Sequence, residues 1–102
     1  MQIKAVVFSV LYLIRQAKAC QHYTSCKCVD AESGMQLNWA SKEACERYGQ
    51  GAEWQGFQHN KCNKYGDGIS KCDFHVKCYE LYKEKYTFEQ PTRFIARCSN
   101  KV

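Results

Sequence analysis

The first 19 residues have a hydrophobic pattern that differs from the rest of the chain. Met1–Lys4 carries one positive charge, Ala5–Ile14 is almost entirely apolar, and small residues at 17 and 19 flank Lys18 just before Cys20. This order is typical of a secretory signal peptide. The apolar run is about half of what a helix needs to cross a bilayer. We therefore predict a signal peptide at 1–19, a single domain at 20–102, and no transmembrane segment in the mature protein.

Three later segments have strand-forming composition. His22–Val29 contains Tyr, Thr and Val, and its two cysteines project from one face because strand side chains alternate. Ala52–Gln58 predicts a second strand, weakened by Gly56. Thr92–Cys98 predicts a third.

Two segments between these strands predict helices. The first begins at Ser41 as N-cap and ends before Gly49, after a turn at 30–34. The second is capped by Ser70 or Asp73 and runs to about Lys85, after a polar, glycine-rich loop at 60–68. Apolar residues follow helical spacing on this second helix: Phe74, Cys78, Leu81 and Tyr82.

The predicted order of strand, helix, strand, helix, strand indicates an α+β fold. We expect a small two-layer α/β sandwich with two helices on one face of a short sheet, mainly antiparallel or mixed. A mature chain of this size buries only a modest core, so further stabilisation is needed.

Cysteines supply that stabilisation. An even number of cysteines in a short exported chain indicates a disulfide framework, and eight of them allow 105 pairings. Each bridge contributes roughly 2–4 kcal/mol by restricting the unfolded chain. All eight lie in the mature part: Cys20, Cys26, Cys28, Cys45, Cys62, Cys72, Cys78 and Cys98.

The net charge of +5 overstates the basic character of the mature domain. Lys4, Arg15 and Lys18 leave with the predicted signal peptide and no acidic residue does, so the mature charge is 5 − 3 = +2. This small charge gives little support to a nucleic acid or a membrane as partner, and we expect no nucleic acid.

Histidines near cysteines raise the alternative of a metal site. Zinc takes such ligands when the thiols are reduced, but export favours disulfides. We therefore predict neither a metal nor a cofactor. The spacings concerned are His22 with Cys26 and Cys28, His59-x-x-Cys62 and His75-x-x-Cys78.

Two enzymatic alternatives are weaker. A cysteine nucleophile needs a spare thiol, which four bridges would not leave. A small secreted fungal ribonuclease of the guanyl-specific type is suggested by the stretch 56–60 with Glu80 and Arg93, but that family has a catalytic histidine near the C-terminus and no histidine follows His75 here. We predict no catalytic residue and no enzymatic activity.

A basic and aromatic surface is the remaining candidate site. Such a surface suits an anionic lipid, a polysaccharide or an acidic protein as partner. The simpler interpretation is a solvated helix face, because Glu80 and Glu84 are interleaved with the cations. Trp39 and Trp54 fit either a sugar-stacking platform or core anchors. The possible binding surface comprises Lys61, Lys64, Lys71, Lys77, Tyr79 and Lys83.

The cysteine pattern resembles that of small cysteine-rich secreted proteins of plant-associated fungi. It is most similar to the biotrophy-associated secreted proteins of the rice-blast type and to effectors with the fold of the smut killer toxin, killer protein six. The matching features, which span nearly the whole mature chain, are Cys20…Tyr23-x-x-Cys26-x-Cys28, Ala44-Cys45, Tyr48-Gly49, His59-x-x-Cys62, Ile69-x-x-Cys72-x-Phe74-x-x-x-Cys78 and the terminal strand with Cys98.

The resemblance implies a small disulfide-rich α/β sandwich that is secreted at a host interface, and it implies no active site. The expected function is that of a monomeric, non-enzymatic effector in the apoplast or interfacial matrix, with an unknown host protein or cell-surface component as partner. An antimicrobial or killer-type toxin is the alternative, which the mature charge of +2 weakens. A ribonuclease-like protein is the second alternative.

Overall fold

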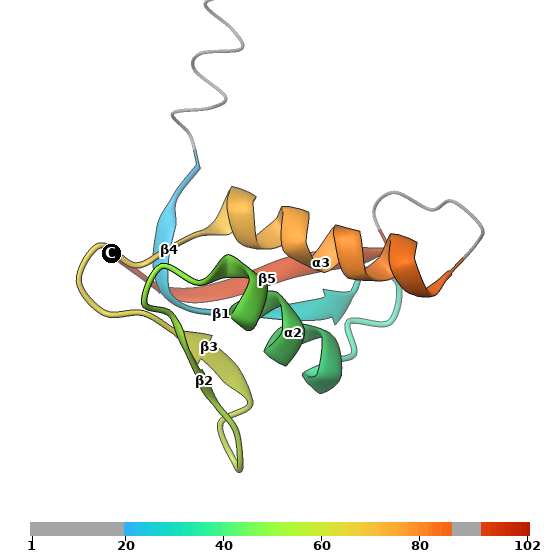
Figure 1. Ribbon diagram of the computed structural model, residues 1–102, viewed down its shortest axis with the longest axis horizontal. Helices are drawn as coiled ribbons and strands as arrows, with labels where there is room; N and C mark the ends of the chain where they lie inside the picture. Colours follow the sequence, from blue (N-terminus) through green and yellow to red (C-terminus); the bar gives the residue numbers. More distant parts are fainter. Residues whose placement is uncertain (1–19, 87–92) are drawn as a thin grey trace, which may run out of the picture.

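The computed structural model describes residues 20–86 and 93–102, so the predicted signal peptide and residue 92 of the predicted last strand lie outside the described residues. Figure 1 shows two helices packed on a twisted sheet. The elements are β1 (His22–Asp30), α2 (Asn38–Tyr48), β2 (Glu53–Gln55), β3 (Lys61–Asn63), β4 (Ile69–Ser70), α3 (Lys71–Lys85) and β5 (Phe94–Lys101).

The sheet is built around β1, and every pairing in it is antiparallel. One edge of β1 pairs with β5 along nearly its whole length, from Tyr23 with Lys101 to Asp30 with Phe94. The other edge is shared between β4 and β3, and β2 completes the sheet beyond β3.

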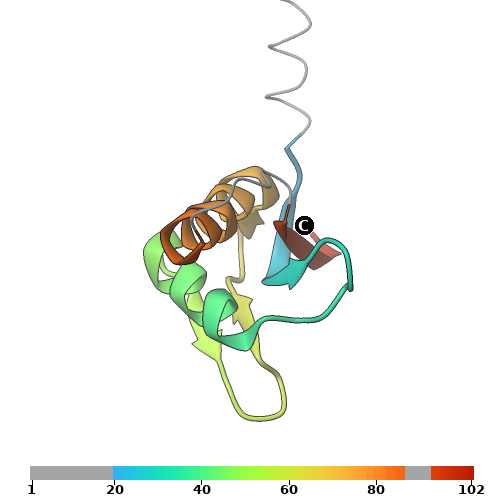
Figure 2. The same cartoon turned by 90° about the vertical axis from the view of Figure 1, so that its right-hand side faces the viewer.

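Both helices lie on the same side of this sheet (Figures 1 and 2). They pack against each other as well as on β1 and β5, so the core is the layer between helices and sheet. The expected α+β two-layer sandwich is therefore confirmed, with an antiparallel sheet of five strands.

Alternation along β1 explains which side chains enter this core. Cys26 and Cys28 face the helices and are buried, and both belong to the core cluster. Ser25 and Lys27 project from the opposite face, because neighbouring strand residues point to opposite sides. The prediction of a strand here is confirmed.

Helix α2 begins four residues earlier than predicted, since its N-cap is residue 37 rather than Ser41. The N-cap is Leu37, whose side chain makes no capping bond. The Ser41 hydroxyl instead accepts the backbone N–H of Cys28 at 2.8 Å and donates to the carbonyl of Leu37 at 2.7 Å. A tertiary hydrogen bond thus uses the hydroxyl that local sequence assigned to the cap.

Helix α3 agrees with the prediction. Ser70 is its N-cap and accepts the backbone N–H of Asp73 at 3.4 Å, and the helix ends at Lys85. The four apolar residues with helical spacing are all buried: Phe74, Cys78, Leu81 and Tyr82.

The prediction of a loop over the whole polar stretch 60–68 is wrong in part. Lys61–Asn63 forms β3, because Cys62 pairs with both Cys26 on β1 and Trp54 on β2. The predicted second strand at 52–58 is shorter, with only Glu53–Gln55 paired, and the last strand extends beyond Cys98 to Lys101.

The predicted disulfide framework is confirmed, with all eight cysteines bridged. Two bridges join a helix to the sheet: Cys28–Cys78 links β1 to α3, and Cys45–Cys62 links α2 to β3. Cys26–Cys98 links the neighbouring strands β1 and β5, and Cys20–Cys72 links the segment before β1 to the first turn of α3.

Candidate functional site

The six residues of the predicted binding surface do not form one patch. Lys71, Lys77, Tyr79 and Lys83 lie on α3, Lys64 directly follows β3, and Lys61 is on β3 itself. The structure therefore divides this set between the helical layer and the sheet.

Carboxylates neutralise much of the charge on the helical side. Glu84 accepts two hydrogen bonds from the Arg47 guanidinium, at 2.5 and 2.7 Å, which lowers the pKa of its carboxyl. Lys77 lies 3.6 Å from Glu80, and Lys64 lies 3.0 Å from Asp67. This face has mixed charge, as the interleaved acidic residues indicated.

The aromatic residues of α3 and its neighbours pack mainly with one another. The ring of Tyr82 is 5.1 Å from Phe94, and Trp39 meets Phe94 edge-on at 5.9 Å, with the Lys85 ammonium 4.4 Å from the Trp39 ring. Trp54 packs against the core from β2. Trp39 remains the more exposed of the two tryptophans.

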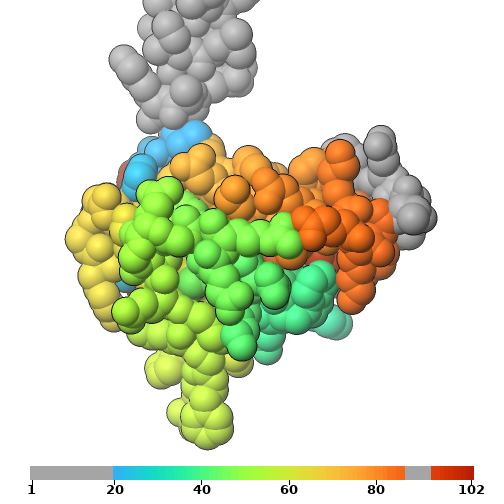
Figure 3. Space-filling view, viewed as in Figure 1, coloured from blue at the N-terminus to red at the C-terminus, as the bar shows by residue number. Residues whose placement is uncertain are grey.

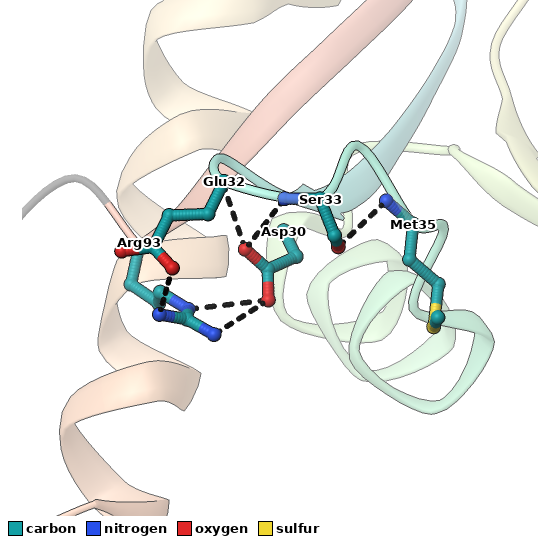
Figure 4. A network of polar contacts seen from close by, with 5 residues as sticks. All are labelled: Asp30, Glu32, Ser33, Met35 and Arg93. Carbon is teal, nitrogen blue, oxygen red and sulfur yellow. Dashed lines mark hydrogen bonds and ion pairs between the residues drawn. The ribbon is translucent and has the colours of Figure 1, made fainter.

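A polar network closes the end of the sheet beside these rings (Figure 4). The Asp30 carboxylate accepts the backbone N–H of Glu32 at 2.9 Å and the Arg93 guanidinium at 3.1 Å, and these bonds lower the pKa of Asp30. Arg93 also lies 2.8 Å from the Glu32 carboxylate. Arg93 thus joins the start of β5 to the end of β1.

The residues considered for acid–base or metal chemistry are dispersed. Glu80 lies beside Arg47 and Lys77, and the His75 Nδ1 accepts the backbone N–H of Ala96 at 3.3 Å. Partial burial lowers the pKa of His75, and the charge of Lys71 adds to this. In the described parts of the chain, no three potential ligands lie close enough to hold a metal ion.

The outer face of the sheet, away from both helices, carries Lys27 and Arg97, which the sequence did not single out, together with Lys61 of the predicted binding surface. Lys27 on β1 is directly opposite Arg97 on β5, and Lys61 projects from β3 on the same face. Together with Ser25, Cys26 and Ser99, these cations line a hollow of about 30 Å³. The alternation of Lys27 with Cys26 and Cys28 was the available signal, but only strand register could bring the three cations together.

The loop 56–60 between β2 and β3 projects from the body of the protein (Figures 1 and 3). Phe57 at this loop is 85% exposed, and its φ of 41° and the φ of 70° at Gln58 are left-handed. Few residues other than glycine adopt this conformation. At the loop's base, the Gln36 amide donates to the carbonyl of Asn60 at 2.7 Å. The loop presents an apolar ring to solvent on a defined backbone.

No family model matches this chain, and no curated protein or solved structure matches it. Neither α2 nor α3 combines the length and apolar character that a membrane-spanning helix needs. The candidate sites therefore rest on their geometry: the projecting loop 56–60 and the basic outer face of the sheet.

Proposed function

We propose that this protein is a secreted, non-enzymatic effector that acts outside the cell, at the interface with a host, by binding a host component. The observation that carries the proposal is a body closed by four disulfides from which an exposed Phe57 projects. The first part of this observation bears on location and the second on binding.

The bridges support an extracellular location. Disulfides form and persist in oxidising compartments, and no cysteine of the chain is left as a thiol. Small exported domains use such bridges because their cores are small. The predicted signal peptide at 1–19 is a second, independent argument for export.

The loop 56–60 supports binding to a protein surface with an apolar pocket. Buried aromatic anchors supply much of the energy of protein interfaces, and a preorganised anchor loses little entropy on binding. Two features hold this loop: the Gln36–Asn60 hydrogen bond and the Cys45–Cys62 bridge at β3. Phe57 costs little to immobilise because its loop is fixed at its base.

Export is tested by producing the full chain in a secreting fungal host and analysing the medium. We expect a mature N-terminus at Cys20 and an intact mass eight hydrogens below that of the reduced chain, two for each bridge. Retention of residues 1–19, or free thiols in the exported protein, would contradict the proposal.

Binding is tested with a tagged protein applied to host tissue during infection, comparing Phe57→Ala with Met35→Ala. Met35 is a matched control because it is also apolar and is 66% exposed. We expect F57A to reduce retention on the host by about tenfold, as loss of an aromatic anchor does, and M35A to leave it unchanged. Equal retention of both variants would refute the role of the loop. Growth inhibition of competing microbes by the pure protein would instead favour the toxin.

A further inference from the structure

Three cations lie in one row across the outer face of the sheet. Lys27 is directly opposite Arg97 in the β1–β5 pairing. On the other side of β1, Cys26 pairs with Cys62, and continuing this register by one residue places Lys61 beside Lys27. Neighbouring strands are about 4.8 Å apart, so the row spans about 10 Å.

This row has no counter-charge close to it. Among residues 20–86 and 93–102, no carboxylate lies within 4.0 Å of the charged nitrogens of Lys27, Lys61 or Arg97. Glu53 on β2 shares this face, two strands away from Lys27, and makes no ion pair with another described residue. Like charges directly opposite each other on a sheet destabilise it. A bound anion would relieve that repulsion.

The hollow beside the row adds hydroxyl groups to the cations. Ser25 and Ser99 are paired on β1 and β5 and line the hollow together with Lys27, Lys61 and Arg97. The Ser25 hydroxyl donates to the Asn63 side-chain oxygen at 2.6 Å, which holds it in place. Ser99 is exposed, so its hydroxyl can donate to a ligand in the hollow.

We propose that this basic row, defined as Lys27, Lys61, Arg97 and Ser99, binds a phosphate monoester group. Such a group carries nearly two negative charges and three strong acceptor oxygens. Arg97 can bind two of these oxygens in parallel, and the two lysines act as point charges on either side. The proposal is independent of the proposed effector function, because it rests on the sheet face rather than on the loop 56–60.

The segregation of charge also explains why the net charge of +2 concealed this site. On the helices, Glu84 is paired with Arg47 and Glu80 with Lys77, and in the segment after β3 Asp67 is paired with Lys64. The cations of the outer face are left in excess, so a small total charge is compatible with a strongly basic surface. Local field, rather than total charge, attracts an anion.

The exported protein is titrated with inorganic phosphate while its backbone amide NMR signals are recorded. In parallel, its binding is measured to phosphatidylcholine vesicles that contain phosphatidic acid or, at equal mole fraction, phosphatidylglycerol. Phosphatidic acid carries a phosphate monoester and phosphatidylglycerol a diester. We expect saturable shifts at the basic row with phosphate, and stronger binding to phosphatidic acid if the group is carried on a lipid.

Single substitutions then locate the site. Lys27→Ala and Arg97→Ala should each weaken phosphate binding by about tenfold, which is the loss of one charge-assisted hydrogen bond. Lys42→Ala, at an exposed lysine of α2, is the control and should leave the affinity unchanged. Equal binding to both vesicles without any shift from inorganic phosphate would overturn the proposal, as would K27A and R97A with wild-type affinity.

Lys27→Glu separates loss of the site from loss of the fold. The new carboxylate lies between Lys61 and Arg97, so we expect phosphate binding to disappear while the urea midpoint stays equal to that of the wild type or rises. A lower midpoint for K27E would show that the three cations do not repel one another, and would remove the physical basis of the proposal.

Discussion

Two of the four disulfides form a matched pair that separates the entropy of a bridge from its packing. Cys20–Cys72 and Cys28–Cys78 span 52 and 50 residues, so they restrict the unfolded chain almost equally. They differ in burial, because Cys28 and Cys78 are both 0% exposed whereas Cys72 is exposed. Replacing each pair with alanines leaves three bridges and no free thiol.

The structure gives the expected magnitudes. Loop closure at these lengths is worth about 4 kcal/mol for either bridge. Removing two buried sulfur atoms adds about 2 kcal/mol for the inner pair, through lost apolar burial and incomplete collapse of the site. We therefore expect the free energy of unfolding to fall by about 4 kcal/mol in C20A/C72A and by about 6 kcal/mol in C28A/C78A.

Urea unfolding followed by tryptophan fluorescence measures both losses. A third variant, Cys28→Ala with Cys78→Val, refills part of the cavity and should recover about 1 kcal/mol. Equal losses for the two alanine pairs would refute the packing argument. A larger loss for C20A/C72A would mean that this bridge holds more of the fold than its exposed position indicates.

Three further predictions concern single side chains. The pKa of His75 in the folded chain is lowered from 6.5, so the unfolded chain takes up the proton first, and the free energy of unfolding should fall as the pH drops from about 6.5 toward the folded pKa. His75→Asn should remove this pH dependence, because its amide oxygen keeps an acceptor for the backbone N–H of Ala96. An unchanged pH dependence in H75N would show that another group causes it. Ser41→Ala leaves the buried N–H of Cys28 without its acceptor, so urea unfolding should show a loss of about 1–3 kcal/mol; a loss near zero would contradict this bond. The pKa of Asp30 is lowered in the folded chain, so its carboxylate stabilises the fold above the unfolded pKa, and this stability is lost as the pH falls through the folded pKa. Asp30→Asn should therefore reduce the loss of unfolding free energy at acid pH. The same acid loss in D30N and wild type would show that the bonds of Asp30 to Arg93 and the loop are unimportant.

Local sequence was sufficient for β1 and α3. The alternation in His22–Asp30 and the helical spacing of Phe74, Cys78, Leu81 and Tyr82 depend on contacts within a few residues, and both elements lie close to where they were expected. The Ser70 cap is local in the same way, since donor and acceptor are three residues apart.

The short strands could not be found by the same reasoning. Pairing with β1, and for β3 also with β2, makes β3 and β4 strands, which have only three and two residues. The polar composition around Lys61–Asn63 favoured a loop, and partners more than 35 residues away in the chain overrode it, as the separation of 38 between Ser25 and Asn63 illustrates. Strand formation is context-dependent for this reason.

The chain's own sequence determined that eight cysteines, a small core and two amphipathic helices must combine in a disulfide-stabilised α+β fold. The tertiary structure decided which cysteines pair, moved the start of α2, and placed Lys27, Lys61 and Arg97 in one row. The physical reason is distance along the chain. Periodicity records contacts between near neighbours, whereas bridges and charge clusters depend on the register between strands that are far apart in sequence.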